Sequence, residues 1–284
     1  MSAVISLEDR GVIEIAGADA TSFLHNLVTN DIAKLASGEA RYCALLAPQG
    51  KILADFLVFA EGEGEMRRYL LDCPREVETD LLRRLGMYKL RAAVKLTSRS
   101  DELAAFCVLC DARPEISALA MARDPRAETL GWRLIAPRDT NAENAREDEN
   151  AREDYEAARI AAGVPRGGVD FAYGAAFPHE ANMDLLAGVD FTKGCYVGQE
   201  VVSRTKHRNL ARKRVTPYHA EGEAPATGTK VMAGEIELGV AGSHSGDKGL
   251  ALIRLDRLAD ALAAGTTPTA GGASLEFVVG RAAS

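Results

Sequence analysis

The chain has 284 residues, of which 47% are apolar, and it carries a formal net charge of −7. This length is sufficient for a large core and for two or three subdomains. The acidic charge argues against a general nucleic-acid-binding protein, because neutralising phosphates requires a basic surface.

The cysteines and the N-terminal segment indicate a cellular compartment. The five cysteines are irregularly spaced, which argues against a disulfide framework and favours a reducing environment. The first residues show no charged-then-apolar signal pattern, and no run approaches the roughly 18 apolar residues of a membrane span. We therefore expect a cytosolic monomer with no membrane partner.

The first hundred residues alternate between predicted strands and predicted helices. Asp19 suits a helix N-cap, and Pro74 suits a first helical turn. Ala47–Gly50 suits a type I turn, so the strands on either side of it should form a hairpin. Apolar runs predict the strands Val4–Ser6, Val12–Ile15, Tyr42–Leu46, Ile52–Phe59, Tyr69–Asp72 and Tyr88–Leu96.

The remaining elements indicate an α+β protein with a separate β-rich end. Strands are expected at Leu103–Cys110 and Trp132–Ile135, and helices at Ile116–Ala122 and Thr140–Ala162. The loop-rich stretch Val164–Thr192 is long for a connection without secondary structure, and such loops are often functional. After Arg214, short apolar runs separated by Gly, Thr and Pro predict a small all-β unit.

The segment Lys193–Arg204, KGCYVGQEVVSR, holds the most suggestive cysteine. A thiol beside Lys193 and shortly before a predicted helix would have a depressed pKa and could be reactive. A structural cysteine in a glycine-rich loop also explains Cys195, and spacing alone favours it over a reactive thiol, so both interpretations stay open. No further cysteine lies in this segment, which disfavours a local metal site. Cys107 and Cys110 have redox-pair spacing but lie in an apolar run, which favours two buried core residues.

The other residue patterns do not identify a function by themselves. The chain has no Walker A motif, no dinucleotide-binding glycine fingerprint and no HExxH zinc motif. Asp55 stands in an apolar strand, where a carboxylate either faces solvent or lines a pocket. The pattern does not choose between the two.

The motif Lys193-Gly194-Cys195-Tyr196-x-Gly198-Gln199-Glu200 resembles the signature of the YgfZ family. These folate-binding proteins are related to the T protein of the glycine cleavage system and to its aminomethyltransferase superfamily. The resemblance extends along the whole chain, through Phe23–Asp31, Gln49–Lys51, Arg159–Pro165, Asn182, Arg204–His207 and Arg212–Arg214.

The resemblance implies an architecture and a role. It implies an α+β fold in which two intertwined ferredoxin-like subdomains, residues 1–208, surround a central folate cavity, with a small C-terminal β-barrel at residues 209–284. It also implies a tetrahydrofolate-binding accessory protein for assembly or repair of [4Fe–4S] enzymes, which affects tRNA modification indirectly. Its partners would be folate and iron–sulfur proteins or assembly factors, with no direct nucleic-acid contact.

The same resemblance suggests site residues and an alternative activity. Asp55 would contact folate, with Leu57, Phe59, Tyr196 and Arg204 as further cofactor-binding residues. Cys195 and Lys193 would form the functional thiol motif. The alternative is a tetrahydrofolate-dependent aminomethyl or one-carbon transferase. However, Ala161 stands where the aminomethyltransferases have a glutamate, which weakens that alternative and favours a protein without turnover.

Overall fold

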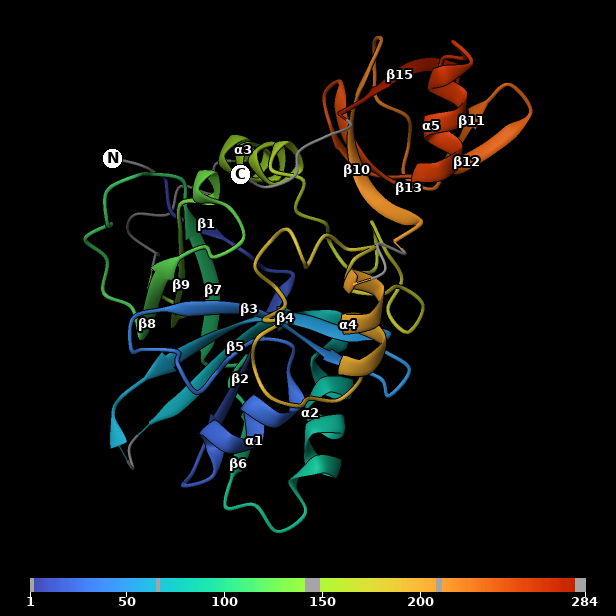
Figure 1. Ribbon diagram of the computed structural model, residues 1–284. Helices are drawn as coiled ribbons and strands as arrows, with labels where there is room; N and C mark the ends of the chain where they lie inside the picture. The colour runs from blue at the N-terminus through green and yellow to red at the C-terminus, as the bar shows by residue number, and fades with distance from the viewer. Residues whose placement is uncertain (1–2, 65–66, 141–148, 208–210, 279–284) are drawn as a thin grey trace.

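The protein is built from two antiparallel sheets and a closed barrel (Figure 1). The computed structural model describes residues 3–64, 67–140, 149–207 and 211–278. The α+β class and the C-terminal barrel expected from the sequence are confirmed. Among the described residues, no helix is long and apolar enough to cross a membrane.

A five-stranded sheet forms the centre of the first half of the chain. Its order is β3-β4-β5-β2-β6. One face packs against the helices α1 (Ala20–Leu27) and α2 (Arg75–Lys89), while the other face carries Leu57, Phe59 and Leu70 into a second core. The strands are β2 (Arg10–Ala16), β3 (Ala40–Leu46), β4 (Ile52–Glu61), β5 (Arg68–Pro74) and β6 (Lys95–Ser98).

A four-stranded sheet closes that second core from the opposite side. Its order is β1-β7-β9-β8, and Leu103, Ala105 and Ile135 meet the central sheet in one apolar cluster. The strands are β1 (Ile5–Ser6), β7 (Leu103–Val108), β8 (Ala120–Arg123) and β9 (Trp132–Pro137), with the 3₁₀ helix η2 (Glu128–Leu130) before β9.

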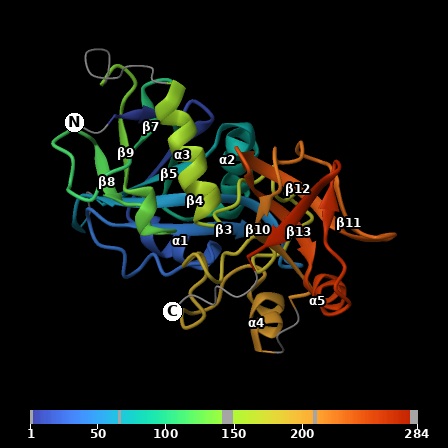
Figure 2. The same ribbon diagram turned by 90° about the horizontal axis from the view of Figure 1, so that it is seen from above.

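The barrel has its own core and stands at one end of the molecule. The helix α3 (Glu149–Ala161) lies between the four-stranded sheet and the barrel (Figure 2). The helix α4 (Gln199–His207) precedes the barrel, and α5 (Leu255–Ala263) packs on it. The barrel strands are β10 (Lys213–Ala220), β11 (Lys230–Ala233), β12 (Ile236–Ser245), β13 (Lys248–Arg254), β14 (Thr269–Ala270) and β15 (Ala273–Phe277).

Several predicted elements are confirmed and two are wrong. The β3–β4 hairpin forms as expected, with the amide of Gly50 donating to the carbonyl of Ala47 at 2.8 Å. The predicted helix Ile116–Ala122 is wrong, because Ala120–Arg123 pairs with β9 and satisfies its backbone in the sheet. The predicted strand Tyr88–Leu96 is also wrong in its first half, since α2 continues to Lys89. Of the predicted helix Thr140–Ala162, residues 141–148 lie outside the described part of the chain.

One buried carboxylate connects the two sheets. Asp72 on β5 is fully buried and accepts hydrogen bonds from Nε of Arg10 at 2.5 Å and from Nε of Arg133 at 2.7 Å. Arg133 lies on β9 and also donates to the hydroxyl of Tyr155 on α3 at 3.2 Å. Burial alone would raise the pKa of Asp72, but the two guanidinium groups outweigh it and lower that pKa.

Removing the charge of Asp72 should destabilise the fold. We expect Asp72→Asn to lower the free energy of unfolding by about 3–5 kcal/mol, because it removes the negative charge to which two buried guanidinium groups are hydrogen-bonded. Urea unfolding at neutral pH measures this change. Since the pKa of Asp72 is lowered in the fold, its contribution is present above the unfolded value of about 3.9 and is lost as the pH falls below it. The difference between wild type and variant should therefore shrink in acid.

Asp256→Asn is the matched control. Asp256 pairs with Arg254 at 2.6 Å in an exposed position in the first turn of α5, so water screens the charge and we expect a much smaller loss than for Asp72→Asn. Equal losses for the two variants would contradict the role given to Asp72.

Candidate functional site

The loop before α4 exposes a single thiol. Of the five cysteines, all within the described residues, Cys43, Cys73 and Cys107 are buried, Cys110 is half-buried and Cys195 is exposed. Burial raises the pKa of the thiols of Cys43 and Cys107 to about 12 in each case, so these two stay protonated at neutral pH. Cys195 is therefore the thiol that a partner can reach.

Lys193 is directed into the protein rather than toward a reacting group. Its ammonium donates hydrogen bonds to the carbonyl oxygens of His25, Val28 and Asn30 at 2.5, 2.7 and 2.9 Å. Burial lowers the pKa of Lys193 to about 8. These bonds tie the loop to the end of α1, so Lys193 positions the loop that carries Cys195.

The rest of the motif packs against the β3–β4 turn. Gly198 has φ of +81°, and a Cβ there would lie 2.7 Å from the carbonyl oxygen of Ala47, so the close approach requires glycine. Tyr196 is 7% exposed and belongs to the apolar core. Arg204 and Glu200 are exposed on α4, and no ion pair joins them in the described structure. The loop is thus fixed at its base while Cys195 stays outside.

Asp55 lies in the interior, which settles where its side chain faces. It is 4% exposed and shares one face of β4 with Leu57 and Phe59. Its two carboxylate oxygens accept hydrogen bonds from the hydroxyl of Tyr42 at 3.0 Å and from the hydroxyl of Tyr173. Burial and the Asp55 carboxylate raise the pKa of both tyrosines, so both hydroxyls remain donors.

The cavity that Asp55 lines is small and strongly polar. Its volume is about 30 Å³ and its walls include Arg10, Arg126, Arg133 and Tyr155. A space of this size holds about one water molecule, whereas sites for drug-sized ligands occupy about 300–1,000 Å³. As arranged, with both oxygens of Asp55 engaged, this cavity does not fit a pterin ring. Of the predicted cofactor-binding residues Asp55, Leu57, Phe59, Tyr196 and Arg204, only Asp55 lines it.

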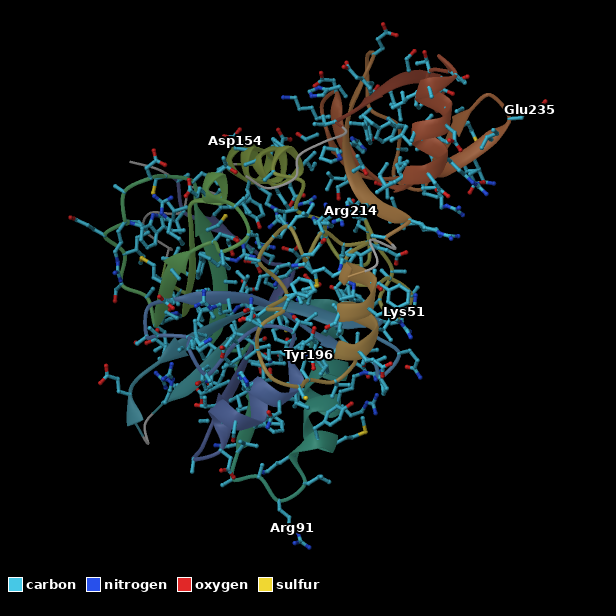
Figure 3. The ribbon with its side chains drawn as sticks, in the orientation of Figure 1. Lys51, Arg91, Asp154, Tyr196, Arg214 and Glu235 are labelled. Carbon is cyan, nitrogen blue, oxygen red and sulfur yellow. The ribbon has the colours of Figure 1, made fainter. Side chains whose placement is uncertain are left out.

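A second cavity, not expected from the sequence, lies between α3 and the barrel. Its volume is about 770 Å³, within the range of small-molecule sites. Figure 3 shows Arg214 at this junction, where it pairs with Asp184 at 2.8 Å. Asn182 donates to the carbonyls of Gly163 and Val215 at 3.0 and 2.9 Å. The walls include Arg126, Ile160, Ala161, Leu186, Val215, Pro217, His219 and Lys248.

The described residues do not form a metal-binding cluster by themselves. No three His, Cys, Asp or Glu side chains of that part of the chain gather as a group able to hold a metal ion. A cluster bound at Cys195 would therefore need ligands from another molecule.

The chain matches two known protein families along most of its length. Residues 2–132 match the family described as the GCVT N-terminal domain, and residues 212–279 match the CAF17 C-terminal β-barrel domain. The structure of the glycine cleavage system aminomethyltransferase T from Bartonella henselae is similar, with a TM-score of 0.75 at 16% identity. That similarity covers 98% of this chain and 84% of the other, and it shows a shared fold.

Two curated relatives are more similar to this chain in sequence than the aminomethyltransferase is. The mitochondrial iron–sulfur cluster assembly factor IBA57 of Mus musculus is 34% identical over 279 residues, which cover 89% of this chain and 77% of the relative. The human protein of the same name is 31% identical over 281 residues, covering 90% and 78%. Both relatives are named as mitochondrial, so the expectation of a cytosolic protein is wrong.

Replacing the ammonium of Lys193 should release the loop. We expect Lys193→Met to lower the free energy of unfolding by about 2–3 kcal/mol, because three buried carbonyl groups lose their charged donor. The variant should also alkylate faster at Cys195 than the wild type does, since the loop is less restrained. Urea unfolding and mass spectrometry of iodoacetamide-treated protein measure the two effects.

Lys206→Met provides the comparison. Lys206 is exposed on α4 and stacks on the ring of Phe191 at 3.5 Å without a buried acceptor. If Lys193→Met behaved like Lys206→Met in both measurements, Lys193 would not hold the loop.

Proposed function

Since the chain belongs to the family of iron–sulfur cluster assembly factors that includes mouse and human IBA57, we propose that it is an accessory factor for iron–sulfur cluster assembly. The resemblance to YgfZ needs one correction. This chain carries the GCVT-like domain and the CAF17 barrel, and its IBA57 homologues are relatives of YgfZ, but the chain is not itself a YgfZ protein.

The observation that carries the proposal is the exposed thiol on a fixed loop. A cysteine thiolate is the usual protein ligand of iron in clusters, and such a cluster usually takes four protein ligands. Cys195 offers one sulfur, and no ligand cluster accompanies it in the described structure. We therefore expect Cys195 to bind a cluster that an iron–sulfur protein or assembly factor presents with the remaining ligands.

The clients we propose are [4Fe–4S] enzymes. Among them are radical enzymes that thiolate tRNA, so an effect on tRNA modification follows indirectly from their assembly or repair. The net charge of −7 favours this indirect route over direct binding of RNA.

Tetrahydrofolate is the ligand we propose for the larger cavity. The volume of about 770 Å³ suits it, and the wall combines apolar side chains with His219 and Lys248, which could bind the glutamate carboxylates. Bound there, the cofactor would supply one-carbon or redox chemistry, while these residues would orient it. Asp55 lines the small cavity and not this one, so its contact with the cofactor stays a prediction. It requires the hydroxyls of Tyr42 and Tyr173 to release the carboxylate and the space beside it to widen.

One residue of the larger cavity argues against a transferase activity. Ala161, where the aminomethyltransferases have a glutamate, lines this wall with only a methyl group. The chain therefore lacks a carboxylate at that position to bind or move a proton.

Loss of the thiol should abolish the cellular function without unfolding the protein. In cells that lack their own relative of this chain, we expect wild type but not Cys195→Ser to restore the activity of a [4Fe–4S] enzyme such as aconitase. Because Cys195 is exposed, the substitution should change the free energy of unfolding by no more than about 0.5 kcal/mol. Cys110→Ser, a half-buried cysteine outside the motif, should restore activity as wild type does. Full rescue by Cys195→Ser would refute the role of the thiol.

Calorimetric titration with reduced tetrahydrofolate under argon tests the cofactor. We expect saturable binding by wild type and about tenfold or more weaker binding by Lys248→Glu, because a carboxylate then repels the ligand. Lys230→Glu, on the outside of the barrel and away from the cavity, should bind as wild type does. Loss of binding in Asp55→Ala but not in Lys248→Glu would place the ligand beside Asp55 instead, at a small cavity that has opened to admit it. If wild type showed no heat of binding, tetrahydrofolate would be rejected as its ligand. The proposed role in cluster assembly would be unaffected, because it rests on Cys195.

A further inference from the structure

The connection between α2 and β6 forms a protruding tip. It lies at the end of the molecule opposite the barrel, and Figure 3 shows Arg91 extending outward from it. We define the α2–β6 tip by Met87, Lys89, Leu90, Arg91 and Lys95. The motif loop near Tyr196 lies in the middle of the molecule, well away from this tip (Figure 3).

Two large apolar side chains of the tip are in contact with water. Leu90 is 89% exposed and Met87 is 55% exposed. Leu90 also ends α2 with φ of +43°, a conformation that glycine adopts far more readily than leucine. A glycine here would relieve the strain and remove the exposed apolar surface, so the leucine indicates a function beyond ending the helix.

The tip is also positively charged, although the whole chain is acidic. Within the described residues, no carboxylate forms an ion pair with Lys89, Arg91 or Lys95. The acidic residue of α2 that comes closest to the tip in sequence is engaged elsewhere. Asp80 pairs with Arg83 and Arg84 further up α2.

Asp19, on the neighbouring α1 side, accepts a hydrogen bond from the amide of Ala93 at 2.7 Å. The Asp19 carboxylate thus binds the backbone of the connection and does not pair with a cation of the tip. The tip therefore presents three unpaired cations around two exposed apolar side chains.

We propose that the α2–β6 tip docks on an anionic phospholipid surface. Leu90 and Met87 would enter the acyl region, while the long side chains of Lys89, Arg91 and Lys95 reach the headgroup phosphates. A protruding tip suits a lipid surface, which adapts to its shape, whereas a protein partner would need a matching hollow. The expectation of no membrane partner rested on the lack of a spanning segment, and a peripheral contact needs none. This proposal does not depend on the iron–sulfur role.

Flotation of the full chain with lipid vesicles tests the proposal. Vesicles of phosphatidylcholine alone are compared with vesicles that contain about 30 mol% phosphatidylserine, a strongly anionic surface. We expect wild type to float with the anionic vesicles, and less so as ionic strength rises from about 0.01 M to about 0.15 M. Leu90→Asp should reduce partitioning by about tenfold or more, and Arg91→Glu by at least about fivefold.

Matched controls separate the tip from general effects of charge and polarity. Arg75→Glu makes the same exchange as Arg91→Glu at the opposite end of α2, and Leu262→Asp removes a leucine that is 47% exposed on α5. Both should float as wild type does. Equal flotation with the two vesicle types, or wild-type flotation by Leu90→Asp, would overturn the proposal. Binding to soluble polyglutamate without vesicle binding would overturn it in favour of an acidic protein partner.

Discussion

The arrangement of the whole molecule depends on buried carboxylates that join separate elements. Asp72 holds Arg10 of one sheet and Arg133 of the other, and Arg133 reaches Tyr155 on α3. Asp170 joins α3 to the barrel, because it accepts hydrogen bonds from Arg159 of α3 and from the amide of Ser243 on β12. Because an unpaired buried charge is costly, each pair allows only one arrangement of its elements.

This rigidity explains the contrast between the two cavities. Around Asp55, hydrogen bonds from Tyr42 and Tyr173 and the neighbouring arginines fill the interior, and little space remains. At the barrel junction, the ion pair of Arg214 with Asp184 and the hydrogen bonds of Asn182 connect the segments that line the larger cavity, and a space of about 770 Å³ remains between them. The fold thus fills the polar site around Asp55 and leaves the larger cavity at the barrel junction open.

The same fold carries different chemistry in different proteins. The Bartonella henselae aminomethyltransferase shares it at 16% identity, while the IBA57 relatives are named for cluster assembly. Function therefore has to be argued from individual positions. Here the informative ones are an alanine in the larger cavity and an exposed thiol on a loop that a buried lysine holds in place.

The sequence alone determined the elements that depend on local chemistry, and only the tertiary structure decided the direction of the polar side chains. The β3–β4 hairpin follows from its turn residues, and the start of α2 follows from Pro74. Strand β8 was missed because an alanine-rich run also suits a helix, and only pairing with β9 decides it. The sequence placed Lys193 beside Cys195, yet its ammonium binds carbonyls at the end of α1, some 165 residues earlier in the chain. Such contacts between distant segments leave no local pattern, because burial and hydrogen bonding are settled only when the elements pack together.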